Sequence, residues 1–146
     1  MARVDGKPDP VELAARSLRH RDRSRQEIDA RLEKAGVGEE ERTDALETLE
    51  RVGYVDDERF ARTRAETLAG RGLGDEAIRA DLVRHGVDGA AREAALGGLT
   101  PEAERAKELV ARLGRTQQTA ARLARKGFSV DSLESALGEL AAGDGP

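Results

Sequence analysis

Three consecutive carboxylates, Asp56, Asp57 and Glu58, are the residues of this chain best suited by type to chemistry. They lie in the stretch GYVDDERFA, between two aromatic residues of a chain that has only one other. Neighbouring carboxylates can bind a metal ion or act as general acid and base. The alternative is structural, because carboxylates are also favoured in the first turn of a helix, where backbone N–H groups are free.

Helical spacing favours the structural interpretation. Consecutive helical residues point in different directions around the axis, and neither His20 nor His85 is close enough in sequence to complete a metal site. With Asp56 as the N-cap, Val55 and Phe60 take the positions of a hydrophobic staple. Tyr54 and Phe60 would then pack between two helical units. We therefore predict a structural joint that is made of Gly53, Tyr54, Asp56, Asp57, Phe60 and Ala61.

The rest of the composition argues against an enzyme. The chain has no cysteine, which excludes disulfides, thiolate nucleophiles and cysteine metal sites. It also lacks a glycine-rich phosphate loop after a strand, a ligand-spaced pair of His and Glu, and a nucleophile next to a base. We expect a protein that is not an enzyme and that uses no metal or cofactor.

Charge and hydropathy limit the partners. Charged residues make up 37% of the chain and the net charge is −4, so any contact with nucleic acid must use a local basic patch. No segment approaches the roughly 18 apolar residues that a membrane span needs. The first ten residues also lack the apolar core of a signal peptide. We expect a soluble, cytoplasmic monomer without a membrane partner.

The pattern of apolar residues predicts an all-α protein. They recur at spacings of three and four almost throughout, and sustained alternation is absent, so we predict about nine helices. Ser24 and Glu27 form a capping box that begins one helix, and Gly36 ends it. The next helix extends over about residues 38–52.

An internal repeat organises these helices. Three segments share apolar positions and a final glycine: RSRQEIDARLEKAGV, LGDEAIRADLVRHGV and GRTQQTAARLARKGF. Their alignment groups Ile28 with Ile78 and Thr119, Leu32 with Leu82 and Leu123, and Gly36 with Gly86 and Gly127. The intervals between these glycines are each long enough for three short helices.

We therefore predict three tandem three-helix units, at residues 10–54, 55–98 and 99–141, between flexible tails at residues 1–9 and 142–146. One unit of this size buries too little surface to be stable alone, so the units should share contacts and form an elongated, curved array. Thr100 is expected to cap the first helix of the third unit, and Pro101 to begin it.

Two basic clusters occupy equivalent places in the first and third units. Such guanidinium groups can bind phosphates or carboxylates of a partner. Cations at an exposed helix end are equally favoured by the helix dipole, and both interpretations stay open. The candidate partner-binding or DNA-binding residues are Arg16, Arg19, Arg21, Arg23 and Arg25 in the first cluster and Arg112, Arg115, Arg122, Arg125 and Lys126 in the second.

GYVDDERFA, followed by G-x-G-x-x-x-I-x-x-x-L-x-x-x-G-V at residues 72–87, resembles the RecX family of bacterial recombinase regulators. The likeness extends from about residue 10 to residue 140. It implies three tandem repeats, each a modified helix-turn-helix, that bind along the groove of the RecA filament on single-stranded DNA. One departure is Leu73-Gly74-Asp75, where the family often carries a basic residue.

The resemblance also implies a mainly inhibitory role in homologous recombination, DNA repair and the SOS response. A protein of this family limits filament extension and the recombinase, ATPase and coprotease activities of RecA. The residues leave one alternative open, an autonomous DNA-binding protein of helix-turn-helix type that uses the same arginines on phosphates. Net acidity argues against this alternative.

Overall fold

Residues 9–143 are described by the computed structural model, with side chains as far as Gly138, and within this range the chain forms nine helices and no strand. The all-α prediction is confirmed. The predicted tails, at residues 1–9 and 142–146, lie largely outside the described residues. The helices are α1 (Pro10–Ser17), α2 (Arg25–Lys34), α3 (Glu39–Arg51), α4 (Asp57–Gly70), α5 (Asp75–Arg84), α6 (Gly89–Gly97), α7 (Glu102–Leu113), α8 (Gln117–Arg125) and α9 (Val130–Gly143).

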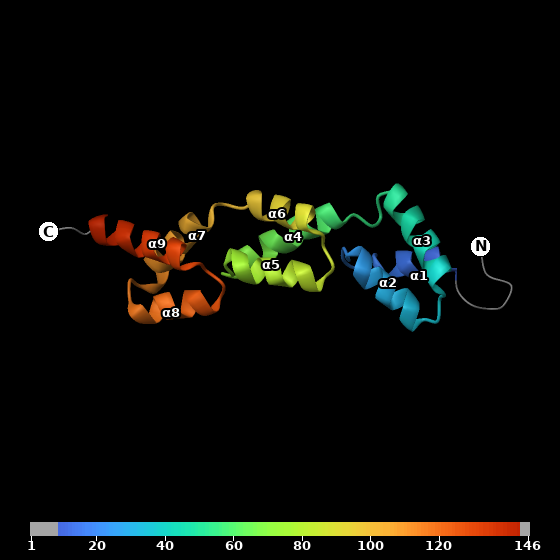
Figure 1. Cartoon of the computed structure of the whole chain (residues 1–146), viewed down its shortest axis with the longest axis horizontal. Helices are drawn as coiled ribbons and strands as arrows, with labels where there is room; N and C mark the ends of the chain where they lie inside the picture. The colour runs from blue at the N-terminus through green and yellow to red at the C-terminus, as the bar shows by residue number, and fades with distance from the viewer. Residues whose placement is uncertain (1–8, 144–146) are drawn as a thin grey trace.

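The helices form three groups along one long axis (Figure 1). α1, α2 and α3 lie at one end, α4, α5 and α6 lie in the centre, and α7, α8 and α9 lie at the other end. The elongated shape is as predicted, and its curvature stays a prediction. None of the helices between residues 9 and 143 has the length and apolar character that crossing a membrane requires.

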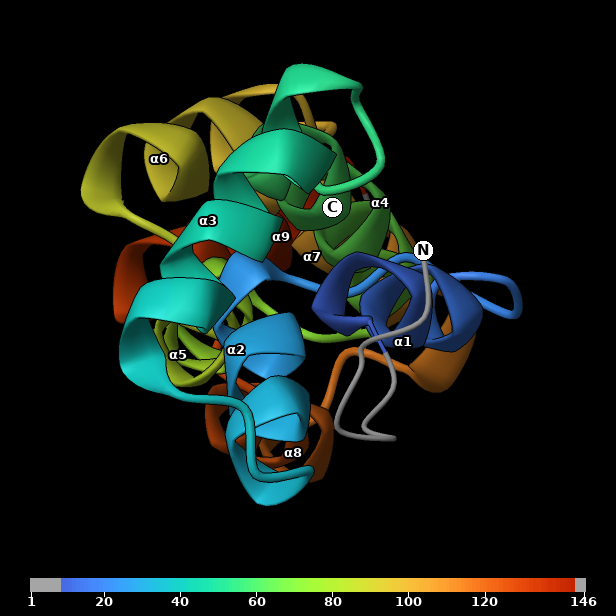
Figure 2. The ribbon, with the colours of Figure 1, turned by 90° about the vertical axis from the view of Figure 1, so that its right-hand side faces the viewer.

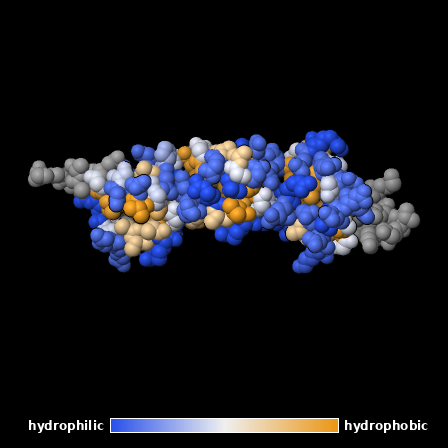
Figure 3. All heavy atoms as spheres, in the orientation of Figure 1, coloured by the Kyte–Doolittle hydropathy of each residue, from blue (hydrophilic) through white to orange (hydrophobic). Residues whose placement is uncertain are grey.

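Each group has its own small, largely aliphatic core, so the described residues have no single hydrophobic centre. On the face seen in Figure 3, hydrophobic surface accordingly appears as separate patches over the three groups. Val55, which the sequence division assigns to the second unit, packs in the first core. The exact unit boundaries stay a prediction. The most buried large side chains are Ile28, Leu32, Leu46 and Leu49 in the first core, Ile78, Leu82 and Val87 in the second, and Val110 and Leu123 in the third.

The turn after each middle helix repeats almost unchanged. Gly36, Gly86 and Gly127 have φ values of 88°, 76° and 97°, in the left-handed region that glycine enters without strain. The next N–H group then donates back to the carbonyl of the aligned leucine, as in a Schellman motif. These bonds are Val37 to Leu32, Val87 to Leu82 and Phe128 to Leu123, at 3.0, 3.1 and 3.1 Å. The predicted repeat is thus a repeat of backbone geometry.

The helix starts agree with the sequence in part. Ser24 and Glu27 form the predicted capping box. The predicted cap and start of the first helix of the third unit are wrong by one position, because α7 begins at Glu102 and Pro101 stands in the cap position. The Thr100 carbonyl instead accepts a hydrogen bond of 2.9 Å from the guanidinium of Arg105.

The middle helices α2, α5 and α8 form a head-to-tail row, which lies on the lower side of the array in Figures 1 and 2. At the junction of α8 with α5, the N–H groups of Gly74 and Glu76 donate to the carbonyls of Lys126 and Gly127, at 2.9 and 3.3 Å. At the junction of α5 with α2, the Gln26 side-chain amide donates to the Arg84 carbonyl at 3.0 Å. Each contact satisfies polar groups that a helix end leaves free, and it aligns the helix dipoles favourably.

Three glycines permit these close approaches, and one of them is Gly127, where a Cβ atom would overlap Ala77 of α5. A Cβ atom on Gly74 would overlap the backbone of Gly127 and Phe128, and one on Gly86 would overlap the side chain of Gln26. Gly74 has an ordinary φ of −84°, so contact rather than conformation requires a glycine there.

Candidate binding surfaces and the joints that position them

The three carboxylates of GYVDDERFA have three different surroundings. Asp56 caps α4 by accepting a hydrogen bond of 3.1 Å from the N–H of Arg59. Asp57 reaches the first unit, where it accepts a hydrogen bond of 2.8 Å from the N–H of Arg25 at the start of α2. Glu58 is exposed. The run thus caps two helices, and no three His, Asp or Glu side chains among the described residues gather to hold a metal ion.

The joint between the second and third units repeats this arrangement. Glu102, the first residue of α7, accepts a hydrogen bond of 2.7 Å from the N–H of Asp75, the first residue of α5. It also accepts bonds of 2.8 and 2.6 Å from the hydroxyls of Ser129 and Ser132. At both joints, therefore, a carboxylate of the later unit caps the middle helix of the earlier one.

The two joint carboxylates differ in acidity. Burial raises the pKa of Asp57, and its one backbone hydrogen bond from Arg25 only partly opposes this. Burial also acts to raise the pKa of Glu102, but hydrogen bonds from Ser132, Asp75 and Ser129 outweigh it and hold the pKa below its ordinary value. The surroundings of Glu102 in the second joint therefore favour the ionised carboxylate, whereas those of Asp57 in the first joint disfavour it.

Tyr54 does not pack between the units. Its exposed fraction is 58%, so this part of the predicted joint is wrong. Arg59 fills the place instead, since its guanidinium donates to both carboxylate oxygens of Asp22 at 2.8 and 2.9 Å. The same guanidinium donates to the Gly53 carbonyl at 3.0 Å. The first joint is therefore held by an arginine.

Phe60 and Ala61 are buried in the second core, with exposed fractions of 4% and 0%. The Phe60 ring lies 5.4 Å from the His85 ring, between centroids. The predicted staple between Val55 and Phe60 is wrong, because Val55 belongs to the first core. The chain crosses from one core to the next between these two residues.

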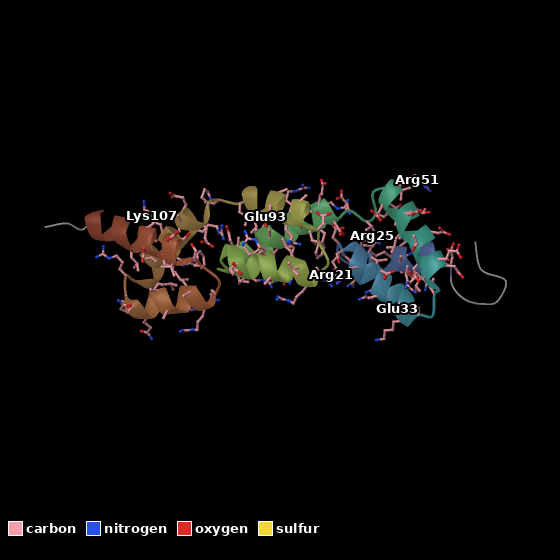
Figure 4. The ribbon with its side chains drawn as sticks, viewed as in Figure 1. Arg21, Arg25, Glu33, Arg51, Glu93 and Lys107 are labelled. Carbon is pink, nitrogen blue, oxygen red and sulfur yellow. The ribbon has the colours of Figure 1, made fainter. Side chains whose placement is uncertain are left out.

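Four of the five arginines in the first-unit cluster form ion pairs within the protein. Arg23 is the most enclosed, with 13% of its side chain exposed, and it donates to the Ser17 carbonyl at 2.8 Å. Arg19 is exposed and has no ion pair with any described residue. Arg21 and Arg25 lie near the boundary with the second unit (Figure 4). The pairs are Arg16–Glu12, Arg21–Glu27, Arg23–Glu27 and Arg25–Glu50, at 3.5, 3.0, 3.8 and 2.6 Å.

A groove of about 410 Å³, here called the first-unit groove, lies between α1 and α2. Of the predicted residues it contains Arg16 alone. The sequence analysis did not select its two other cations, Arg31 and Lys34. The groove is lined by Leu13, Arg16, Ser17, Arg31, Lys34 and Ala35.

A larger groove of about 560 Å³, here called the third-unit groove, lies where α7 and α8 meet the end of α4. It brings together Arg112, Arg122 and Lys126, three of the five predicted residues of the second cluster. Arg115 and Arg125 are exposed outside its lining. Its charged and apolar lining residues are Arg71, Arg105, Arg112, Arg122, Lys126, Glu66, Glu108, Ala69, Leu99, Leu109, Leu113 and Leu123.

The two grooves are related by the repeat. Each lies between the first and the middle helix of a unit, and the alignment pairs Arg31 with Arg122. The second unit has Asp81 at this position, where two hydrogen bonds of 2.8 and 2.9 Å from Arg64 hold the pKa of the carboxyl below its usual value. The outer units therefore present cations where the central unit is neutralised.

Comparison with known proteins identifies the family. The family model for the second three-helix domain of RecX matches residues 56–96. The regulatory protein RecX of Stenotrophomonas maltophilia strain K279a is 34% identical over 137 residues, which cover 87% of this chain and 84% of that protein. This chain belongs to the RecX family. The RecX protein of Xanthomonas axonopodis pv. citri strain 306 shows the same 34% identity, over 87% of this chain and 85% of that protein.

Solved RecX structures share the fold. The crystal structure of RecX from Lactobacillus salivarius superposes with a TM-score of 0.78 at 22% identity, over 90% of this chain and 94% of that one. A second crystal structure of regulatory protein RecX gives a TM-score of 0.74 at 24% identity, over 87% and 72% of the two chains. The predicted RecX fold is therefore confirmed, and membership supports a regulatory role.

Proposed function

We propose that this RecX-family protein is a non-enzymatic regulator, and mainly an inhibitor, of a RecA recombinase in the cytoplasm. It binds as a monomer in the groove of the RecA filament on single-stranded DNA and limits filament extension. The recombinase, ATPase and coprotease activities fall as a result, which places the protein in DNA repair and the SOS response. The observation that carries the proposal is the RecX relationship, which covers 87% of the chain.

The structure supports a physical route to inhibition. The units are linked by backbone hydrogen bonds from Gly74 and Glu76 and by the capping carboxylates Asp57 and Glu102. Such an array resists bending more than units on free linkers would. A stiff rod that contacts adjacent protomers opposes the rearrangement that ATP hydrolysis drives, because the protomers cannot move apart without breaking contacts.

The predicted contact residues differ in how freely they can reach a partner. Arg19, Arg112, Arg122, Arg125 and Lys126 have no ion pair with any described residue. Arg16, Arg21 and Arg25 can exchange their partners, because exposed ion pairs contribute only about 0–1 kcal/mol. Arg23 mainly positions the turn before α2. Arg115 is exposed and remains a candidate contact.

The test is to add the protein to RecA filaments and to measure the ATPase and strand-exchange rates. Both rates should fall, and the protein should bind filaments much more tightly than naked single-stranded DNA. The double substitution Arg19→Ala/Arg21→Ala should weaken filament binding, whereas Arg62→Ala, which changes an exposed arginine of α4, should not. Unchanged rates would refute the proposal. Equal affinity for naked DNA, with a steep dependence on salt, would favour the DNA-binding alternative.

A further inference from the structure

The third-unit groove gathers cations that the protein itself leaves unpaired. Arg71, Arg112, Arg122 and Lys126 line it, and none of them forms an ion pair with a described residue. Glu66 and Glu108 also line the groove, but these four cations outnumber them. Elsewhere the described arginines commonly find acidic partners, as Arg64 and Arg79 do. In a chain of net charge −4, such a local excess of positive charge favours an anionic occupant.

The floor of the same groove is apolar. Leu99 and Leu109 line it as half-buried side chains, and Leu113 stands at the edge with 41% of its surface exposed. Leu123 lies beneath them in the third core, with 1% exposed. The fifth cation, Arg105, is nearly buried and is held by Asp75 at 2.8 Å, so it supports the wall of the groove. The leucines of the groove can cover an apolar side chain of a partner. The unpaired cations around them can bind carboxylates on either side of that side chain.

This combination fits an acidic helix better than a nucleic acid strand. Single strands are usually gripped by stacking their bases on aromatic rings, and no aromatic residue lines the groove. An amphipathic helix presents leucines at three- and four-residue spacing next to charged residues, which is the pattern that helix-binding grooves recognise. The volume of about 560 Å³ is sufficient for a few such anchor side chains.

We propose that the third-unit groove binds an acidic amphipathic helix of a partner protein, with leucine-type anchors against Leu109 and Leu113 and carboxylates against Arg112, Arg122 and Lys126. The first-unit groove presents the equivalent Arg31 with Arg16 and Lys34, and is a second, smaller site of the same kind. The central unit offers no such site, because Arg64 and Asp81 neutralise each other. The inference adds a partner class to the proposed function, but its test does not depend on recombinase inhibition.

The test uses the full chain, labelled with ¹⁵N, and three probes. The first probe is a helical peptide of about 15 residues with leucines at helical spacing and glutamates beside them. The second is a scrambled peptide of the same composition, and the third is an oligothymidine of matched charge. Gly70, Gly72 and Gly98 line the groove, so their amide signals report on binding there. Gly38 and Gly53 lie in the first unit, outside this groove, and their signals serve as the reference. The helical peptide should shift the first three signals at the lowest concentration.

Charge reversal provides the matched variants. Arg112→Glu/Arg122→Glu should weaken binding of the helical peptide by about tenfold or more, because two favourable charge contacts become repulsive. Arg51→Glu/Arg62→Glu changes the net charge equally on exposed arginines outside the groove and should alter affinity by less than about threefold. Thermal melting of each variant checks that it remains folded.

Several outcomes would overturn the proposal. They are no shift with the helical peptide, equal binding of the scrambled peptide, or stronger shifts of the groove glycines with oligothymidine. The acidic helix α3 of a second copy is another possible occupant, so sedimentation of the free protein is measured as well. Self-association that Arg112→Glu/Arg122→Glu abolishes would assign the groove to a dimer contact. None of these results would alter the expected effect on the recombinase ATPase.

Discussion

Replacing Gly74 by Ala should loosen the contact between the second and third units without touching either core. The new methyl group would overlap backbone atoms of Gly127 and Phe128, which cannot rotate aside as a side chain could. The two segments must therefore move apart. That movement stretches the hydrogen bonds from Gly74 to Lys126 and from Glu76 to Gly127.

The magnitude follows from these contacts. Each hydrogen bond contributes about 0.5–1.5 kcal/mol, and forced overpacking costs about 1–3 kcal/mol. Gly74→Ala should therefore lower the free energy of unfolding by about 2–6 kcal/mol. Urea unfolding measures the total, and amide hydrogen exchange at residue 74 and at Glu76 shows where the loss occurs.

Gly38→Ala is the matched control. Gly38 is likewise an N-cap glycine in extended backbone, with φ −67° and ψ 158° against −84° and 170° for Gly74. A Cβ atom on Gly38 would meet nothing within 4 Å. The control therefore carries the same change of cap residue without the clash. Equal losses of stability in the two variants, or unchanged exchange at Glu76, would refute the role of the junction.

Three further predictions test the cores and joints. Phe60→Ala should lower the free energy of unfolding by about 3–5 kcal/mol, because the ring is 4% exposed, and a thermal midpoint that barely moves would contradict this burial. The lowered pKa of Glu102 stabilises the fold above its ordinary pKa of 4.5, and this stability is lost as pH falls through the lowered pKa, so Glu102→Gln should reduce the acid sensitivity of urea unfolding. Asp57 has the opposite sign: its raised pKa stabilises the fold below 3.8, and this contribution is lost as pH rises. Asp57→Asn should therefore gain stability relative to the unaltered chain as pH rises, and a gain on acidification would contradict the assignment.

Helix ends were predictable because a few neighbouring residues decide them. The capping box of Ser24 with Glu27 and the left-handed glycines after the middle helices depend on groups three to five positions apart. The repeat was visible for the same reason. The repeat alignment pairs Arg31 with Arg122, a predicted contact residue, and so could have identified Arg31 as a candidate. The search for dense runs of arginine did not select it.

The misplaced residues depend on partners far along the chain. Tyr54 and Phe60 have similar local settings, but Arg59 occupies the joint through Asp22, 37 positions earlier. Arg25 is engaged by Glu50, 25 positions later, which no count of neighbouring charges indicates. Arg71 and Arg105 enter the third-unit groove only because α4 ends beside α7. Such pairings require the tertiary structure.

The two joints differ in how they support the middle helix of the second unit. The N-terminal end of α2 has its own cap in Ser24, and Thr116 caps α8 in the same way, but Gly74 provides no side-chain cap for α5. The free N–H groups at the start of α5 are satisfied by the third unit alone, through Glu102 and the carbonyls of Lys126 and Gly127. The first unit contacts α5 at its other end, through Gln26. The second unit therefore depends on the third for the stability of its middle helix more than on the first, which makes the third unit a structural requirement of the rod as well as a candidate binding surface.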